Sequence, residues 1–464
     1  MKKIEVSMLV PGSVADGNYY TVGGELLISK GVTISPKHLE AMTRRNIFDV
    51  YLKNFEEEEE IHQIISKEFN HLEDISLNEI AKTVLPDAAP VKRTLLKIPE
   101  LKNIKPGEEG ALQLLQTKKV LELDSRLKDG FAPDRPVGPA LREKATQMSV
   151  TQRTEEYKTG IALSHAQALA QVRDILNDLA DAKKTDEAAI RNVVNSFVKT
   201  YLTDKSILLN ISNIKSAEGD YIYHHTLNVC LLAINIAAAA KYSEKQILEI
   251  GMGALLHDVG MLLVPDEIRF KKGRLEKDEW YEVQKHAVLG MHLLEKINRV
   301  PESALYVAYQ THERENGKGY PKQRSGRFIH AFAKIVQIAD VYESLCSPRD
   351  YRPPYLPYRA MELLIKMSVK NLLSIDHVKA FLTYASLFPI GSIVELSNHC
   401  VARVVQANEL HQTKPVVSVI TDAETVLLPK GKIYQLDLSQ DSSIQIIRAI
   451  EPNNLPLLDI MHGF

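Results

Sequence analysis

Apolar residues recur at helical spacing through the middle of the chain. The pattern predicts one amphipathic helix that ends near Leu179 and a second one that Thr185 is suited to cap. The two apolar faces consist of Ala168, Val172, Ile175, Leu176 and Leu179, and of Ile190, Val193, Val194, Phe197, Val198 and Tyr201. Such faces can pack onto a helical core of the same chain or pair with a second chain, and packing within the chain is the favoured alternative.

Toward both ends of the sequence, the spacing of the apolar residues changes from the helical repeat to the pattern of β-strands. Near the start, "EVSMLV", "ELLISKG" and "IFDVYL" predict strands, with Gly23-Gly24 as a turn and a short helix over residues 35–45. After Phe388, the runs "GSIVELSN", "CVARVVQ", "PVVSVIT" and "KIYQLDLSQ" are rich in β-branched residues and are separated by polar turns. They predict a small antiparallel β module.

The segment between the first strands and the helices has a different character. An acidic run covers Glu56 to Glu60, and prolines recur from Pro86 to Pro139, which indicates an irregular connector with short helices. The chain is therefore predicted to be a multidomain α+β protein. Its parts are residues 1–55 (small N-terminal α/β module), 56–183 (irregular and helical connector), 184–388 (all-α core) and 389–464 (C-terminal β module and tail).

Composition excludes several classes of protein. With 464 residues, 25% of them charged, and a net charge of −2, the chain resembles a folded protein with no global field for a nucleic acid polymer or an anionic membrane. We find no signal-type N-terminus and no run of about 18 apolar residues, so we expect a cytoplasmic protein without membrane insertion. The three cysteines, Cys230, Cys346 and Cys400, fit packed, reduced thiols better than a disulfide framework.

Histidines and acids are strung across residues 221–342 beside the helical patterns. The segments are "YHHTLNV", "LLHDVG", "KHAVLGMHLL", "THERENGKGYP" and "IADVY". Imidazole and carboxylate side chains on facing helices suit a metal site at the centre of a bundle.

The His257-Asp258 pair means little alone and gains its weight from the order and spacing of the whole set. It ends an apolar helix that Ser243 and Gln246 open as a capping box, and Gly260 follows as a C-terminal stop. Adjacent side chains on a helix diverge, so the pair fits a two-metal site in which the aspartate bridges both ions. Taken alone, the pair fits a core histidine beside a capping aspartate better than it fits a metal site.

The complete constellation resembles the HD-GYP family of bacterial cyclic di-GMP phosphodiesterases, a branch of the HD metal-dependent phosphohydrolases. The resemblance covers residues 186–388 and includes the signature Gly319-Tyr320-Pro321 within "HERENGKGYP", followed by "IADVYESL". It implies an HD-type helical domain with two or three metal ions, often iron. For this chain we expect two divalent ions, with iron as the first choice and manganese or zinc as alternatives that the ligands also suit. It also implies cyclic di-GMP as the substrate and signalling partner proteins at the GYP loop. A homodimer is the alternative in which the two amphipathic helices pair with a second chain.

The resemblance assigns roles to individual residues. The metal ligands would be His225, His257, Asp258, His286, His312 and Asp340, with His257 and Asp258 also named as catalytic. The substrate contacts would be Arg349 and Arg352, because guanidinium groups bind phosphate. Arg314 and Lys318 flank the GYP loop and are candidates for adding positive field at the substrate, but they fit exposed loop charges at least as well. The loop would be shaped by Gly317, Gly319, Tyr320 and Pro321. His224 and His292 match no ligand position, and we expect them at the surface or behind the ligands.

Four positions depart from the family pattern. Thr311 replaces a histidine that binds the second metal, Met261 replaces a phosphate-binding lysine, Asn316 replaces an aspartate, and Tyr221 replaces the acid of a third metal site. We therefore expect a dinuclear centre whose second ion has a weakened set of ligands. The alternatives are a degenerate HD-GYP domain that binds nucleotides or proteins without turnover, and an HD hydrolase for another nucleotide, against which the GYP loop argues.

Overall fold

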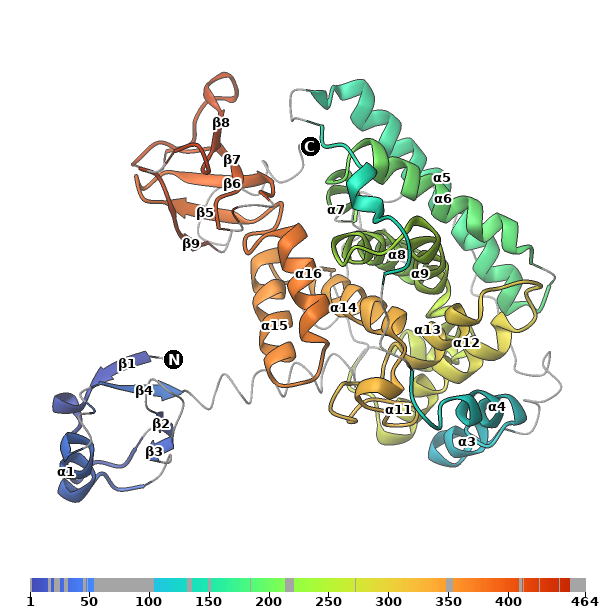
Figure 1. The fold of residues 1–464 in the computed structure, drawn as a ribbon, viewed down its shortest axis with the longest axis horizontal. Helices are drawn as coiled ribbons and strands as arrows, with labels where there is room; N and C mark the ends of the chain where they lie inside the picture. The colour runs from blue at the N-terminus through green and yellow to red at the C-terminus, as the bar shows by residue number, and fades with distance from the viewer. Residues whose placement is uncertain are drawn as a thin grey trace. The chain divides into compact units, whose positions relative to one another are not determined.

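The computed structural model describes residues 2–15, 18–20, 26–28, 32–44, 47, 49–53, 104–131, 136–148, 152–183, 185–212, 221–271, 273–347, 354–408, 411, 413–424, 426–441 and 443–450. The chain forms two compact units, residues 1–71 and residues 72–464. The first holds a small sheet, and the second holds a helical body and a C-terminal sheet (Figure 1). The predicted fold class, a helical core with a small module at each end, is confirmed.

The N-terminal unit is an antiparallel sheet of order β1-β4-β2-β3 with one helix. Its elements are β1 (Lys2–Glu5), η1 (Val6–Met8), β2 (Asn18–Tyr20), β3 (Leu26–Ile28), α1 (Pro36–Arg44) and β4 (Asp49–Lys53). The predicted strand "EVSMLV" is wrong beyond Glu5, where pairing with β4 ends and the 3-10 helix η1 begins. The turn expected at Gly23-Gly24 lies outside the described residues.

Helix α8 (Tyr221–Ala239) is the centre of the helical body. Nearly every one of its residues is buried, as expected for a helix that is apolar all round. It packs against α9 (Glu244–Leu256) and α14 (Ala331–Cys346), and α9 also packs against α13 (Glu302–Gln310). Ser243 and Gln246 form the predicted capping box at the start of α9.

The two amphipathic helices pack within the chain. They are α5 (Glu155–Ala180), which contacts α8, and α6 (Glu187–Thr203), which contacts α9. The predicted cap of the second helix is wrong by one residue: the side chain of Asp186, not that of Thr185, accepts from Ala188 N at 3.1 Å. A carboxylate one position later competes with the threonine for the same free amides.

The remaining helices of this unit surround the central ones. They are α3 (Gly107–Leu114), α4 (Lys118–Arg126), η5 (Leu141–Lys144), α7 (Ile207–Ile211), η7 (Val259–Leu263), α10 (Asp266–Arg269), α11 (Lys277–Gln284), α12 (His286–Leu294), η8 (Gly326–Phe328), α15 (Pro357–Val369) and α16 (Ile375–Ala385). Helix α12 packs on η7 and α13, which brings the "KHAVLGMHLL" segment to the end of α9.

The C-terminal sheet is antiparallel with the order β8-β7-β6-β5-β9. Its elements are β5 (Ile393–Leu396), β6 (Val401–Gln406), β7 (Val416–Val419), η9 (Lys430–Lys432), β8 (Tyr434–Asp437) and β9 (Ile446–Ala449). The first four strands match the predicted runs. Strand β9 was not predicted, because its residues are largely exposed and carry no buried alternation.

Two helical segments, Tyr221–Ala239 and Glu244–Leu263, are long and apolar enough to cross a membrane by length and composition alone. Their apolar windows are 89% and 72% buried inside the protein, as the central helices of a folded domain are. Their apolar character is thus explained by the core that they form.

Candidate metal centre

The site is built where α9 ends. His257 is the C-cap residue of α9, and the chain turns at Asp258 into the 3-10 helix η7. Gly260 was expected to stop the helix, but it lies inside η7 and serves a different purpose. A Cβ atom at Gly260 would lie 2.0 Å from the main-chain oxygen of His286, so only glycine allows α12 to approach this closely.

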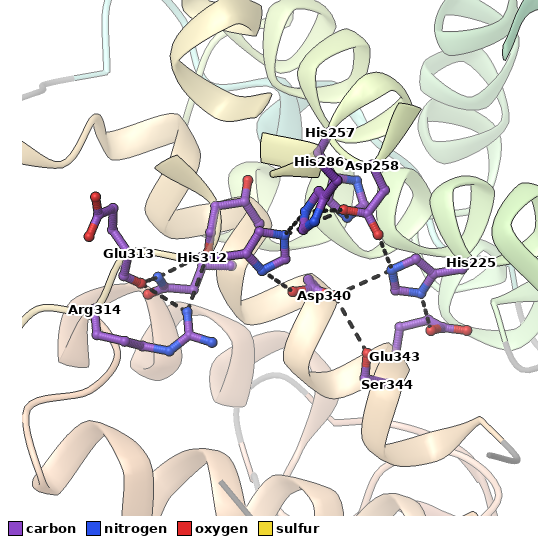
Figure 2. Close-up of polar contacts among 12 residues, drawn as sticks. His225, His257, Asp258, His286, His312, Glu313, Arg314, Asp340, Glu343 and Ser344 are labelled. Carbon is purple, nitrogen blue, oxygen red and sulfur yellow. Dashed lines mark hydrogen bonds and ion pairs between the residues drawn. The ribbon is translucent and has the colours of Figure 1, made fainter. Parts of the chain in front are cut away.

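The structure brings five of the six predicted ligands together in two groups that share Asp258, and the sixth, Asp340, lies beside both groups (Figure 2). The first group is His225, His257 and Asp258, and the second is Asp258, His286 and His312. The ligand atoms within each group lie within 4.8 Å of one another. Asp340 lies between the groups, with its carboxylate oxygens 3.3 Å from His225 Nε2 and 3.8 Å from His312 Nδ1.

The two oxygens of Asp258 face different groups. Oδ2 lies 3.6 Å from His225 Nε2, whereas Oδ1 lies 3.3 Å from His286 Nε2 and 3.4 Å from His312 Nε2. Oδ1 is also 3.4 Å from His257 Nε2. A carboxylate in this position can bridge two ions, one through each oxygen.

Hydrogen bonds fix three of the imidazole rings with Nε2 directed into the centre. His257 Nδ1 donates to Ala254 O at 2.7 Å, and His286 Nδ1 donates to Val283 O at 2.6 Å. Since a carbonyl oxygen can only accept, Nδ1 carries the proton and Nε2 carries a lone pair. His225 Nδ1 bonds in the same way to Glu343 Oε2 at 2.5 Å.

This arrangement fits a bound cation. Nitrogen lone pairs and carboxylate oxygens converge at distances too short to be favourable unless positive charge lies between them. His257 is fully buried, and its Nε2 has no hydrogen-bond partner among the described residues. Imidazole and carboxylate ligands with second hydrogen bonds of this kind are typical of transition-metal sites.

The pKa shifts show the same demand for positive charge. Burial alone would raise the pKa of Asp258, but His257, His286 and His312 hold it well below its usual range. Burial would lower the pKa of His225, but Glu343 and Asp340 outweigh it and raise that pKa well above its usual range. Burial lowers the pKa of His312 to about 4, so this imidazole stays neutral, as a metal ligand must, while the carboxylates and His225 favour positive charge in the centre.

The GYP loop closes over the second group. Gly319 packs against the main chain of Glu313, where a Cβ atom would lie 2.4 Å from the Glu313 Cα, and Tyr320 N donates to His312 O at 3.0 Å. The Tyr320 ring stacks on His312, with centroids 4.9 Å apart and an interplanar angle of 8°. Gly317 adopts a φ of +75°, which favours glycine. The loop thus holds one ligand in place.

Comparison with known proteins now identifies the fold family. A family model described as an HD domain matches residues 170–372, and a model described as a KOW domain associated with an HD domain matches residues 393–458. The first of these matches spans all six clustered ligands. The chain belongs to the HD-GYP family.

Several curated proteins that are similar to this chain are named as phosphodiesterases of cyclic dinucleotides. A cyclic di-GMP phosphodiesterase of Pseudomonas aeruginosa is 27% identical over 64% of this chain and 71% of the relative. One of Thermotoga maritima is 33% identical over 38% of this chain and 48% of the relative. A 3'3'-cGAMP-specific phosphodiesterase of Vibrio cholerae is 28% identical over 40% of this chain, which spans only 37% of that relative. A solved HDGYP protein of Bdellovibrio bacteriovorus aligns with 82% of this chain and 97% of its own, at 14% identity and a TM-score of 0.40.

The cationic residues assigned from the HD-GYP pattern differ in environment. Arg314 is only 4% exposed, and its guanidinium donates to the main-chain oxygens of Glu313 at 2.9 Å and Thr311 at 3.4 Å. Lys318 is exposed in the loop. Arg349 and Arg352 lie outside the described residues.

Positions where this chain departs from the HD-GYP pattern are also visible. The Thr311 hydroxyl donates to Val307 O at 2.7 Å, so it is directed at its own helix. Met261 packs with Val264, Leu275 and other residues of a small apolar cluster. The ring of Tyr221 stacks on His225 with centroids 5.4 Å apart.

Sequence reasoning missed two acidic residues that support the ligands. Glu343 orients His225, and it stands three residues after Asp340 on α14, a spacing that places both on one helix face. Glu313 accepts from the main-chain amides of Lys322 and Arg324, each at 2.8 Å. Burial raises the pKa of Glu313 to about 7, against the opposing effect of these two amides.

The two histidines that match no ligand position make contacts of their own. His224 is half-buried on α8, with its ring 6.5 Å from that of His165. His292 bonds through Nε2 to Thr117 Oγ1 at 3.1 Å and pairs through Nδ1 with Glu295 at 3.3 Å. Neither belongs to the ligand groups found among the described residues.

Proposed function

We propose that this chain hydrolyses cyclic di-GMP at a dinuclear metal centre. The observation that carries the proposal is Asp258, whose two oxygens face two separate groups of histidine ligands. The first ion would be held by His225, His257, Asp258 and Asp340, and the second by Asp258, His286 and His312. The names of the curated relatives support the reaction and the class of substrate.

The bound ions would activate a water, screen the phosphodiester and hold the attacking and leaving oxygens in line. The protein supplies the geometry for this chemistry. Main-chain carbonyls fix His257 and His286, while Glu343 fixes His225, so that these three rings would not have to reorient when substrate binds. The Asp258 side chain, 13% exposed, is the most accessible of the clustered ligands, which supports approach of water and substrate from its side.

Substrate phosphates would be contacted by Arg349 and Arg352, as in the family pattern. We expect Arg349→Ala and Arg352→Ala to weaken binding of cyclic di-GMP and to leave metal content unchanged, because these residues would contact phosphate and not metal. Calorimetry with unchanged nucleotide affinity would remove them from the site.

The proposal is tested with anaerobically purified protein loaded with iron or manganese. Metal content per chain is measured beside hydrolysis of cyclic di-GMP and of 3'3'-cGAMP, and Asp258→Asn serves as the inactive variant that should lose metal. Two ions per chain and turnover of cyclic di-GMP are the expected results. If the metal-loaded protein hydrolyses neither dinucleotide, the proposed function is wrong.

A second candidate is a nucleotide-binding signalling module without turnover. The observation that favours it is Met261, which places an apolar side chain where the family has a phosphate-binding lysine and which packs into an apolar cluster. In that case the metal-loaded protein would bind cyclic di-GMP in calorimetry, and the nucleotide would be recovered intact.

A further inference from the structure

Helix α4 contacts the segment that follows the GYP signature. Asp124 on α4 pairs through Oδ2 with Lys322 Nζ at 3.1 Å and through Oδ1 with the guanidinium of Arg324. The side chains of Asp124, Lys322 and Arg324 are 19%, 23% and 15% exposed, respectively. Tyr309 OH also donates to Asp124 Oδ1, at 3.4 Å. Because these charges are largely withdrawn from water, losing one partner costs more than it would at the surface.

The same two basic residues hold Glu313 through their main chains. Lys322 N donates to one carboxylate oxygen of Glu313 and Arg324 N donates to the other. Glu313 directly follows His312, the ligand on which Tyr320 stacks. The path from Asp124 to His312 thus consists of ion pairs to two side chains, hydrogen bonds from their amides, and one peptide bond.

Helix α4 also forms ion pairs with α12 and α13, the two helices next to which the histidines of the second ligand group lie. Lys119 pairs with Glu295, the C-cap residue of α12, at 2.6 Å, and Arg126 pairs with Glu302, in the first turn of α13, at 2.5 Å. His286 begins α12, and His312 follows the end of α13. Helix α4, which lies near α12 in Figure 1, is therefore joined by an ion pair to each of the two elements that carry the histidines of the second group.

We infer that Asp124 is a positioning residue for His312 and so sets the affinity of the second metal site. It lies in the segment that the sequence predicted to be a connector, and it touches no proposed ligand directly. The inference rests on the proposed dinuclear centre, which would bind divalent cations. It does not require that the protein hydrolyses a substrate. Its physical basis is that a ligand held by a satisfied hydrogen-bond network loses less freedom when the ion binds.

The test compares Asp124→Asn with Glu122→Gln in the full-length protein. Glu122 lies on the same helix and pairs at 3.7 Å with Lys118, whose side chain is 92% exposed. Mn²⁺ is titrated into metal-free protein and free Mn²⁺ is followed by electron paramagnetic resonance. For Asp124→Asn we expect the affinity of the weaker site to fall about 10–100-fold, with the tighter site unchanged. Glu122→Gln should bind both ions as the wild type does.

Further measurements separate positioning from a merely structural role. With Asp124→Asn, saturating Mn²⁺ should restore most of kcat, and Asp124→Glu should recover part of the weaker site's affinity. Two results would overturn the inference: wild-type affinities at both sites, or loss of both sites together with a lowered melting temperature. If the wild type binds two ions without hydrolysing any dinucleotide, the proposed function fails, and the Mn²⁺ titration still decides the role of Asp124.

Discussion

Asp258 carries the largest share of the proposed chemistry because it is the only clustered ligand, among the described residues, that belongs to both donor groups. Its pKa is held well below the usual range by three imidazoles despite burial, so it stays ionised at neutral pH. In the proposed dinuclear centre, a carboxylate with these properties would hold two ions near each other and offset their mutual repulsion. The remaining ligands differ in how firmly the protein fixes them.

At Thr311 the chain supplies no side-chain ligand for the second ion of the proposed centre. Its hydroxyl donates to Val307 O, which also accepts from Thr311 N at 3.0 Å. We expect Thr311→Val to keep the wild-type metal content and to change stability by no more than about 1 kcal/mol, since the carbonyl retains a donor. Metal analysis and denaturant unfolding check this. Loss of one ion in Thr311→Val would show that the hydroxyl is a ligand after all.

His165 makes stability depend on pH. It is 3% exposed, and burial, aided by His224, lowers its pKa to about 4 from an ordinary value of 6.5. Between pH 6.5 and pH 4, His165 therefore binds a proton more readily in the unfolded chain than in the folded protein. The free energy of unfolding consequently falls as the pH drops from 6.5 toward 4. The loss at the lower end is about 3 kcal/mol from this group alone.

We expect His165→Gln to remove this part of the pH dependence. Urea unfolding of the wild type and of His165→Gln at pH 7 and pH 5 gives the difference, and His411→Gln, at an exposed histidine, serves as control. Equal pH dependence in the wild type and in His165→Gln would contradict the assignment.

At the scale of elements, the close packing of η7 on α12 assembles the second ligand group. Gly260→Ala would place a Cβ atom 2.0 Å from His286 O and 2.6 Å from Gly290 N, both of them backbone atoms that cannot move aside alone. We expect this variant to lose about 1–3 kcal/mol of stability and to bind the proposed second ion with a larger loss of affinity than the first. Metal titration and thermal unfolding measure both effects.

A glycine without such a neighbour provides the control. Gly160 is exposed in α5, and a Cβ atom added there would have nothing within 4 Å beyond its own helix. Gly160→Ala should bind metal normally and gain about 0.5–1 kcal/mol of stability, because alanine suits a helix better. If Gly260→Ala behaved like Gly160→Ala, the contact between η7 and α12 would not matter for the site.

Features that depend on local residue spacing could be predicted from the sequence, whereas features that depend on contacts between distant parts of the chain could not. The capping box at Ser243 and the apolar faces of α5 and α6 depend on local spacing, and the structure has them as expected. The purpose of Gly260 depends on α12, which is distant in sequence, so a local rule assigned it wrongly. Glu343 and Asp124 act through partners far along the chain, and no local pattern marks such contacts.

At the scale of the whole molecule, the chain consists of two compact units, and every clustered ligand belongs to the second. The first unit has a core of its own, formed by Val6, Leu9, Ala15, Tyr19, Ile28, Ile34, Met42 and Val50. Units with separate cores can usually fold separately. The metal centre should therefore not need the N-terminal sheet.

We expect a chain that lacks residues 1–71 to keep the metal content of the full-length protein and, if the proposed function holds, its rate of cyclic di-GMP hydrolysis at saturating metal. The reason is that the ligands, the GYP loop and the Asp124 contacts all lie within residues 72–464. Metal analysis, circular dichroism and a hydrolysis assay on both chains provide the comparison. A truncated chain that folds with full helix content but binds fewer ions would show that the N-terminal unit contributes to the centre. A truncated chain that binds both ions but hydrolyses at a different rate would instead assign the N-terminal unit a regulatory role.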